Sequence, residues 1–185
     1  MQRVARDIDE VLVPFVKPMA KWRGLKMPPS NTRYNYVYRE MFNITEDESR
    51  RMVEEFYRSS EFLKLKPIHD SQIGIVRLRG QSKKLYAVTG RQDSARERTE
   101  IWLDQHFPGM FDDLVITNSY TDHEIKKVDV CKSLALDLII DDNTDICIEC
   151  AQSGIRARNF MGYEEVYPWC EHTNMSMYGW NEYKK

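Results

Sequence analysis

Four short stretches of the chain carry groups that could act together on a charged substrate. They are two carboxylates one residue apart, a hydroxyl followed by glycine and arginine, a lysine, and a second pair of carboxylates: Asp7 and Asp9, Thr89-Gly90-Arg91, Lys127, and Asp141-Asp142. Carboxylates hold divalent cations, while hydroxyl and ammonium groups balance the charge on phosphoryl oxygens. These residue types therefore predict a metal-assisted phosphate site.

Most of these groups follow apolar runs that are typical of buried strands, and helical patterns separate the runs. Strands are predicted at residues 4–8, 85–88, 114–116, 138–140 and 156–160. Helices are predicted at residues 71–80, 94–107, 128–136 and 145–153. This alternation favours a three-layer, Rossmann-like α/β fold with a right-handed, largely parallel sheet. Ligands bind beyond the carboxyl ends of such strands, so we expect the polar groups to meet there.

Residues 13–70 do not follow this alternation. Prolines and aromatic residues interrupt the periodicity, and Thr45 and Glu48 have the spacing of a capping box at the start of a helix. We therefore expect a small, mostly helical insertion after the first strand. The domain organisation would be an α/β core at residues 1–12 and 71–185, with the insertion between these two parts.

Composition limits the classes of function. The 185 residues are 42% hydrophobic and 30% charged, which suits one soluble domain with a real core. A net charge of −2 and a pI near 6.1 give no general reason to expect a nucleic acid or a membrane as partner. No apolar run is long enough to span a bilayer, and the N-terminus lacks the apolar stretch of a signal peptide. Four cysteines indicate no disulfide framework, so we expect a cytoplasmic location.

Taken in order, the four stretches resemble the motifs of the haloacid dehalogenase (HAD) superfamily, on its phosphatase side. The resemblance rests on Asp-x-Asp-x-Val at residues 7–11, the strand that ends in Thr89, Lys127 placed 14 residues before Asp141, and Asp141-Asp142. Three further segments are similar to the branch that contains deoxyribonucleotide 5′-nucleotidases: TGRQDSARERTEIWLDQHFPGMFDD, residues 126–145, and Tyr-Pro-Trp at 167–169.

The resemblance implies a HAD-like fold and a division of chemical labour among the carboxylates. Asp7 would be the nucleophile that forms an aspartyl-phosphate, and Asp9 would act first as the acid and then as the base. A magnesium ion (Mg2+) would bind Asp7, a backbone oxygen of Asp9, and one or both of Asp141 and Asp142.

The resemblance also implies a binding site for the phosphoryl group. Thr89 and Lys127 would hold the phosphoryl oxygens, with Gly90 following in the same motif. Arg91 could contact the phosphate or a sugar, or it could pair with Asp93.

The insertion would then be a cap that selects the leaving group. The 5′-nucleotidase branch stacks a base on cap aromatics and on a phenylalanine shortly after the nucleophile motif, and Phe15 lies at a compatible position. Other aromatics could share this role or form a small core of the cap: Trp22, Tyr34, Tyr36 and Tyr38. The implied substrate is a small phosphate ester, with a nucleoside or deoxynucleoside monophosphate as the leading candidate.

Two positions depart from the family pattern. Glu10 stands where many relatives have a small residue, which leaves the contact between this loop and the substrate open. Arg6 replaces an apolar residue directly before Asp7. Either the strand is wet at this position or Arg6 has a buried acidic partner.

Three alternatives remain open from the residues alone. The substrate could be another phosphate ester, including a nucleic-acid end bound by the basic cluster at Arg77, Arg79, Lys83 and Lys84. The chain could be a non-catalytic binding domain that keeps the fold. A zinc site could form from Cys147 and Cys150 with Cys131, Cys170, His123 or His172, although cysteines on a predicted helix more often pack as small apolar residues.

Overall fold

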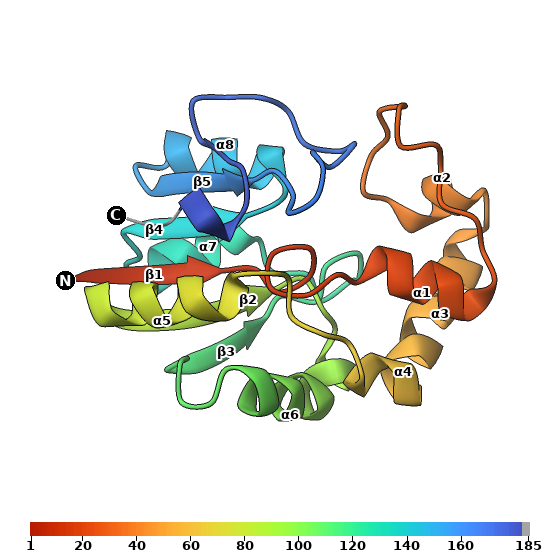
Figure 1. Cartoon of the computed structure of the whole chain (residues 1–185), viewed down its shortest axis with the longest axis horizontal. Coiled ribbons are helices and arrows are strands. Elements are labelled where there is room, and N and C mark those ends of the chain that lie inside the picture. Colours follow the sequence, from red (N-terminus) through yellow and green to blue (C-terminus); the bar gives the residue numbers. More distant parts are fainter. Residues whose placement is uncertain (183–185) are drawn as a thin grey trace.

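The computed structural model describes residues 1–182. These residues form a six-stranded parallel sheet in the order β3-β2-β1-β4-β5-β6 (Figure 1). The strands are β1 (Gln2–Arg6), β2 (Ser82–Thr89), β3 (Asp113–Ile116), β4 (Leu138–Asp141), β5 (Arg156–Phe160) and β6 (Ser176–Met177). The predicted α/β fold with a parallel sheet is confirmed, and β1 lies between β2 and β4.

The strands are apolar on both faces, and successive residues therefore join two separate hydrophobic clusters. In β1, Val4 packs on one face and Ala5 on the other. The face of Val4 is covered by α5 (Ser71–Gln81) and α6 (Arg96–His106), and the face of Ala5 by α7 (Lys127–Ser133) and α8 (Thr144–Gln152). This arrangement gives the predicted three layers.

Four helices precede α5 and lie beyond the carboxyl end of β1 (Figure 1). They are α1 (Val16–Arg23), α2 (Tyr38–Phe42), α3 (Glu46–Arg58) and α4 (Ser60–Leu63). The capping box at the start of α3 is confirmed, because Thr45 Oγ1 accepts the N–H of Glu48 at 3.2 Å and Glu48 accepts the N–H of Thr45 at 2.8 Å. The sequence did not predict α2 and α4, since helices of 5 and 4 residues are too short to show a period.

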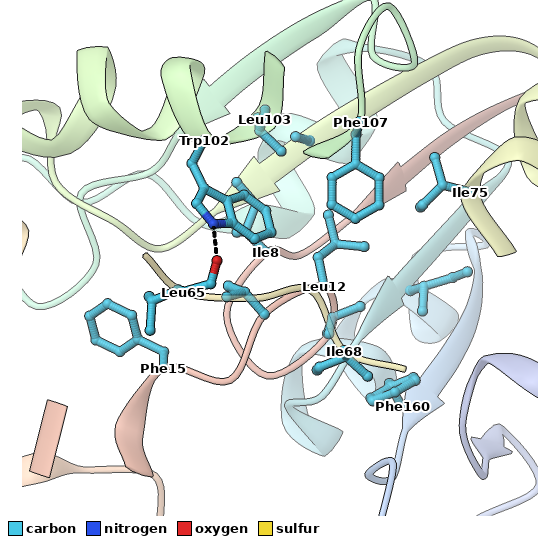
Figure 2. Packing of buried hydrophobic residues seen from close by; sticks show 14 of the residues in the cluster. Ile8, Leu12, Phe15, Leu65, Ile68, Ile75, Trp102, Leu103, Phe107 and Phe160 are labelled. Atoms are coloured by element: carbon cyan, nitrogen blue, oxygen red, sulfur yellow. Dashed lines mark hydrogen bonds between the residues drawn. The ribbon is translucent and has the colours of Figure 1, made fainter. Parts of the chain in front are cut away.

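The apolar packing of the sheet continues into these helices. Phe56 of α3 and Phe62 of α4 belong to the same cluster as Val4. Figure 2 shows this region, where the indole N–H of Trp102 donates a hydrogen bond of 2.8 Å to the carbonyl of Leu65. The helices beyond the strand ends are therefore anchored to the core by shared packing.

Arg6 is fully buried, so the strand is not wet directly before Asp7. The guanidinium of Arg6 lies 4.9 Å from the centroid of the Trp180 ring. The indole N–H of Trp180 donates a hydrogen bond of 2.8 Å to the carbonyl of Val11. The segment around Trp180 thus packs against both the strand that leads to Asp7 and the loop that follows it.

Candidate active site at the carboxyl ends of the strands

Asp7 leaves the carboxyl end of β1 and enters a tightly closed loop. The N–H of Asp7 donates to the carbonyl of Ile140 at 2.9 Å, which extends the pairing of β1 with β4. The N–H groups of Leu12 and Val13 then return to the carbonyl of Ile8, at 2.8 and 3.2 Å. Because the loop closes on itself so early, Asp7 and the carboxylate two residues later both border one cavity.

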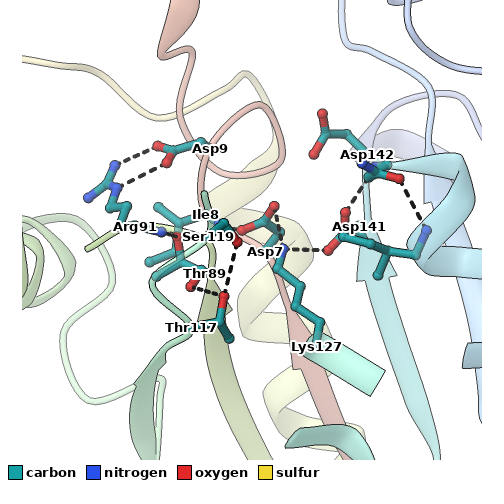
Figure 3. A network of polar contacts seen from close by, with 12 residues as sticks. Asp7, Ile8, Asp9, Thr89, Arg91, Thr117, Ser119, Lys127, Asp141 and Asp142 are labelled. Carbon is teal, nitrogen blue, oxygen red and sulfur yellow. Dashed lines mark hydrogen bonds and ion pairs between the residues drawn. The ribbon is translucent and has the colours of Figure 1, made fainter. Parts of the chain in front are cut away.

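Lys127 lies between the carboxylates of Asp7 and Asp141 (Figure 3). Its Nζ is 2.8 Å from Oδ2 of Asp7 and 2.6 Å from Oδ2 of Asp141. Burial alone would lower the pKa of Lys127, but the two carboxylates raise this pKa above its ordinary value. The first residue of α7 is thus held as a cation next to Asp7.

Asp7, Asp141 and Asp142 form a buried acidic cluster. One carboxylate oxygen of each residue lies within 4.8 Å of the others. Burial raises the pKa of Asp7 to about 7 against the opposing effect of Lys127, and it raises the pKa of Asp142 well above the ordinary value. When all three carboxylates are ionised, Lys127 leaves two negative charges unbalanced. Closely spaced oxygen donors with excess negative charge suit a hard divalent cation such as Mg2+.

The late Tyr-Pro-Trp segment contacts both carboxylate loops. The indole N–H of Trp169 donates to Oδ2 of Asp142 at 2.8 Å, and the hydroxyl of Tyr167 donates to the carbonyl of Glu10 at 2.8 Å. The rings of Tyr167 and Trp169 stack with centroids 4.6 Å apart. One aromatic pair therefore positions Asp142 and the loop that carries Asp7.

Asp9 is paired with Arg91 rather than with a group of the acidic cluster. Arg91 donates from Nη2 to Oδ1 of Asp9 at 2.6 Å and from Nε to Oδ2 at 3.1 Å. The expected alternative pair of Arg91 with Asp93 does not form, since Asp93 lies 4.0 Å from Arg96 and accepts from Asn118. Figure 3 shows Asp9 and Arg91 on one side of Asp7, with Asp141 and Asp142 on the other.

The motif after β2 forms a side wall of the site. Gly90 borders the cavity, whereas Thr89 is fully buried and its Oγ1 accepts the N–H of Arg91 at 3.3 Å. A Cβ on Gly90 would lie 2.9 Å from Oγ of Ser119, so glycine allows this close approach. Sequence reasoning missed Ser119, which also borders the cavity. Its position shortly after the predicted strand at 114–116 was the available signal.

A cavity of about 350 Å3 opens above Asp7, Lys127 and the acidic pair. Its outer wall is aromatic and comes from residues 13–70 and from the loop after β3: Tyr36, Tyr38, Tyr57 and Tyr120. Phe15 is not among the lining residues; it is 1% exposed and packs edge-on against Phe56 at a centroid distance of 5.3 Å. Trp22 also packs on Phe56. Of the aromatics singled out from the sequence, Tyr36 and Tyr38 therefore face the cavity.

Glu10 is buried within the loop instead of facing a substrate. Its Oε1 accepts the N–H groups of Phe15 and Val16 at 2.9 and 2.7 Å, at the start of α1. Burial raises the pKa of Glu10 to about 7. The backbone φ of Glu10 is +61°, in the left-handed region that favours small residues. The carboxylate thus ties the loop after Asp7 to the start of α1.

The cysteines considered for zinc do not assemble a metal site in the part of the chain that the structure describes. Cys131, Cys147 and Cys150 are buried in the cluster beneath α7 and α8, while His123 and His172 are exposed. Among the described residues, the acidic cluster is the group of metal-ligating side chains that comes together.

Solved structures share this architecture. A HAD-like hydrolase from Streptococcus pneumoniae superposes with a TM-score of 0.62 at 14% identity, covering 100% of this chain and 91% of the other. A HAD family hydrolase from Deinococcus radiodurans, with bound phosphate and sodium, gives 0.58 at 12% identity and covers 91% and 84%. The chain has the HAD-like fold. A predicted phosphoglycolate phosphatase from Haemophilus somnus has the same HAD-like fold, with a TM-score of 0.55 at 14% identity, covering 90% and 87%.

No family model matches the sequence, and no curated protein matches it as a relative. The HAD-like fold is therefore established by structure, at identities too low to carry a function with it. None of the helices within residues 1–182 is long and apolar enough to cross a membrane.

Proposed function

We propose that this chain is a phosphatase that hydrolyses a phosphate monoester through an aspartyl-phosphate on Asp7. The observation that carries the proposal is the position of Lys127, which pairs with Asp7 and Asp141 at the base of the cavity, next to Asp142. A nucleophile, a cation for phosphoryl oxygens and ligands for a divalent ion thus lie together. The hydrolase and phosphatase descriptions of the structural neighbours support the same reaction class.

The reaction divides into two displacements. In the first, a carboxylate oxygen of Asp7 attacks phosphorus, and the bond from phosphorus to the ester oxygen breaks. The leaving oxygen keeps the electron pair and takes a proton from Asp9. In the second, Asp9 takes a proton from water, the water oxygen attacks phosphorus, and the electron pair of the broken bond returns to Asp7. The products are an alcohol and inorganic phosphate.

The acidic cluster fits a magnesium ion. Asp7, Asp141 and Asp142 would hold it, with the carbonyl of Asp9 as a further ligand. When bound, the ion balances the excess negative charge and reduces the repulsion between Asp7 and an anionic phosphate. Lys127, supported by the backbone around Gly90, would bind the phosphoryl oxygens.

The aromatic wall supports a nucleoside monophosphate as the substrate. A nucleobase needs a flat apolar surface with a few polar groups, and the cavity combines tyrosine rings with Gln92. The hydroxyl of Tyr57 donates to Oε1 of Gln92 at 2.9 Å, and Gln92 donates to the carbonyl of Ser119 at 2.9 Å. The amide of Gln92 is therefore fixed at the cavity wall, where it could read the edge of a base.

Phosphate release from a small aryl phosphate tests the reaction class. We expect the wild-type protein to be active with Mg2+ and inactive with a chelator, and Asp7→Asn to be inactive in both conditions. Asp129→Asn is a matched control, because Asp129 is exposed on α7. Full activity of Asp7→Asn would exclude the nucleophile. An inactive wild-type protein on every ester of a broad panel would favour the non-catalytic binding domain.

A panel of nucleoside monophosphates, sugar phosphates and phosphorylated oligonucleotides tests the substrate. We expect Tyr38→Ala to lower kcat/KM for a nucleotide by about 5- to 150-fold while it changes the aryl phosphate less, since base stacking contributes roughly 1–3 kcal/mol. Phe15→Ala should affect both esters equally, because Phe15 packs away from the cavity. Activity restricted to oligonucleotides would replace the nucleotide by a nucleic-acid end.

A further inference from the structure

All three nitrogen atoms of the Arg91 guanidinium donate hydrogen bonds to protein oxygens. Nε and Nη2 donate to the two carboxylate oxygens of Asp9, at 3.1 and 2.6 Å, and Nη1 donates to Oγ1 of Thr99 at 2.9 Å. The Arg91 side chain is 1% exposed although it borders the cavity. A guanidinium engaged in this way is poorly placed to bind a substrate phosphate.

Two phenylalanine rings also pack against the guanidinium. The Cζ atom of Arg91 lies 4.8 Å from the ring centroid of Phe62 and 5.7 Å from that of Phe15. Both phenylalanines belong to the segment of residues 13–70. The guanidinium is therefore clamped between this segment and α6, which carries Thr99, and its direction toward Asp9 is fixed by packing.

The geometry of the pair fixes the direction of the Asp9 carboxylate. A bidentate pair with an arginine engages both carboxylate oxygens and holds the group in one orientation. In the second displacement this carboxylate takes a proton from water. The Asp9 side chain is 17% exposed at the cavity, so water can reach it.

We propose that Arg91 is a positioning residue for Asp9: it aims this carboxylate at the water that breaks down the aspartyl-phosphate, and it does not bind the substrate phosphate. The proposal rests on the proposed phosphatase function and gives one motif residue a different role from its neighbours. Gly90 and Lys127 would serve the phosphoryl group, whereas Arg91 would serve proton transfer.

The two roles predict different effects on the two displacements. An aryl leaving group is stable as an anion and needs little help from an acid, while an alkyl leaving group needs a proton. Without Arg91, Asp9 is misdirected, so the aspartyl-phosphate still forms from an aryl ester but breaks down slowly. A residue that bound phosphate would instead slow the first displacement for every ester and weaken the binding of inorganic phosphate.

Rapid-mixing kinetics of Arg91→Gln with Mg2+ distinguish these cases. For an aryl phosphate we expect a burst of nearly one alcohol per folded active site, followed by a steady rate at least ~100-fold below wild type, which is the usual size of acid–base catalysis. For an alkyl phosphate we expect the same loss without a burst. The inhibition constant of inorganic phosphate should change less than about twofold.

Arg98→Gln is the matched control. Arg98 lies on α6, the helix that carries Thr99, and donates to the carbonyl of Tyr57 on α3, not to Asp9. It should show no burst. A double variant, Asp9→Asn with Arg91→Gln, should be no slower than Asp9→Asn alone, because the arginine acts through the aspartate. Arg91→Lys keeps the positive charge but cannot form the bidentate pair with Asp9, and it should show a smaller burst. This variant preserves the test if the glutamine variant is unfolded.

The absence of a burst with the aryl ester, together with weaker inhibition by inorganic phosphate, would overturn this role of Arg91, as would multiplied losses in the double variant. These outcomes differ from failure of the proposed function, which would appear as an inactive wild-type protein.

Discussion

The two ends of the parallel sheet hold carboxylates in opposite ways. At the amino end, Asp112 accepts the N–H of Leu85 at 2.8 Å and is paired with Lys84 at 2.9 Å and with Arg79. Burial alone would raise the pKa of Asp112, but these contacts lower it. At the carboxyl end, burial and like charges raise the pKa of Asp7 to about 7.

The two ends differ in whether the protein itself balances the charge of the carboxylates. At the amino end one carboxylate meets two cations, whereas at the carboxyl end three carboxylates meet Lys127. The amino end also accounts for part of the basic cluster that could have bound a nucleic acid. Arg79 and Lys84 of this cluster pair with Asp112, at the end of the sheet opposite the cavity.

The largest effect is expected from the lysine at the carboxyl end. Lys127→Met would leave Asp7 and Asp141 without their cation, and breaking a buried ion pair costs roughly 3–5 kcal/mol. Urea unfolding without divalent ions measures this change in the free energy of unfolding. Lys126→Met is the control, since Lys126 is 69% exposed. Equal losses in the two variants would mean that the acidic cluster does not depend on Lys127.

Mg2+ should stabilise the protein by binding at the carboxyl end of the sheet and not at the amino end. A cation that binds the folded protein at 100 times its dissociation constant stabilises it by about 2.7 kcal/mol. Thermal unfolding with and without Mg2+ should show this gain in the wild-type protein and in Asp112→Asn. Asp142→Asn, which removes an expected ligand, should show a smaller gain; an undiminished response would place the cation elsewhere.

Asp112→Asn should destabilise the protein by about 2 kcal/mol at pH 7, because hydrogen bonds to a charged group are lost. Since the folded pKa lies below the ordinary value of 3.8, the contribution of Asp112 is present above that pH and is lost as the pH falls below it. The difference between variant and wild type should therefore shrink in acid. Denaturant titrations from pH 7 to pH 3 measure it, and a constant difference would contradict the assignment.

The aspartate-to-asparagine change at the carboxyl end should alter the free energy of unfolding in the opposite direction and by the smallest amount. Without a cation, Asp142→Asn removes a charge that repels Asp7 and Asp141, while an amide oxygen can still accept from Trp169. We expect a gain of about 1 kcal/mol in the free energy of unfolding. Destabilisation instead would show that the three carboxylates do not oppose one another.

The sequence predicted the elements whose pattern is local. Apolar runs located the strands, and the rule that ligands bind at the carboxyl ends of parallel strands predicted that Asp7 and Asp141 meet. The place of Lys127 beside them was implied by the family resemblance. Residue types then indicated the charge of the site. These predictions succeed because a parallel sheet places the ends of distant segments at one edge, regardless of how the remaining side chains pack.

Contacts that depend on the exact path of the chain could not be predicted in this way. The pair of Asp9 with Arg91 joins two loops 82 residues apart and excludes the sequence neighbour Asp93. The capping role of Glu10 depends on a left-handed backbone conformation, which an acidic residue in the sequence does not predict. The strand β6 has two residues and is held by its neighbour in the sheet, so no period marks it.

The packing of Trp180 against Arg6 and Val11 has a consequence for the order of assembly during translation. The ring covers the strand that leads to Asp7, and a side chain on Gly74 would collide with it. The loop after Asp7 is synthesised long before Trp180, so it lacks this packing partner until residue 180 has been added. A nascent chain therefore carries the loop incompletely packed while the segments between residues 13 and 180 are made.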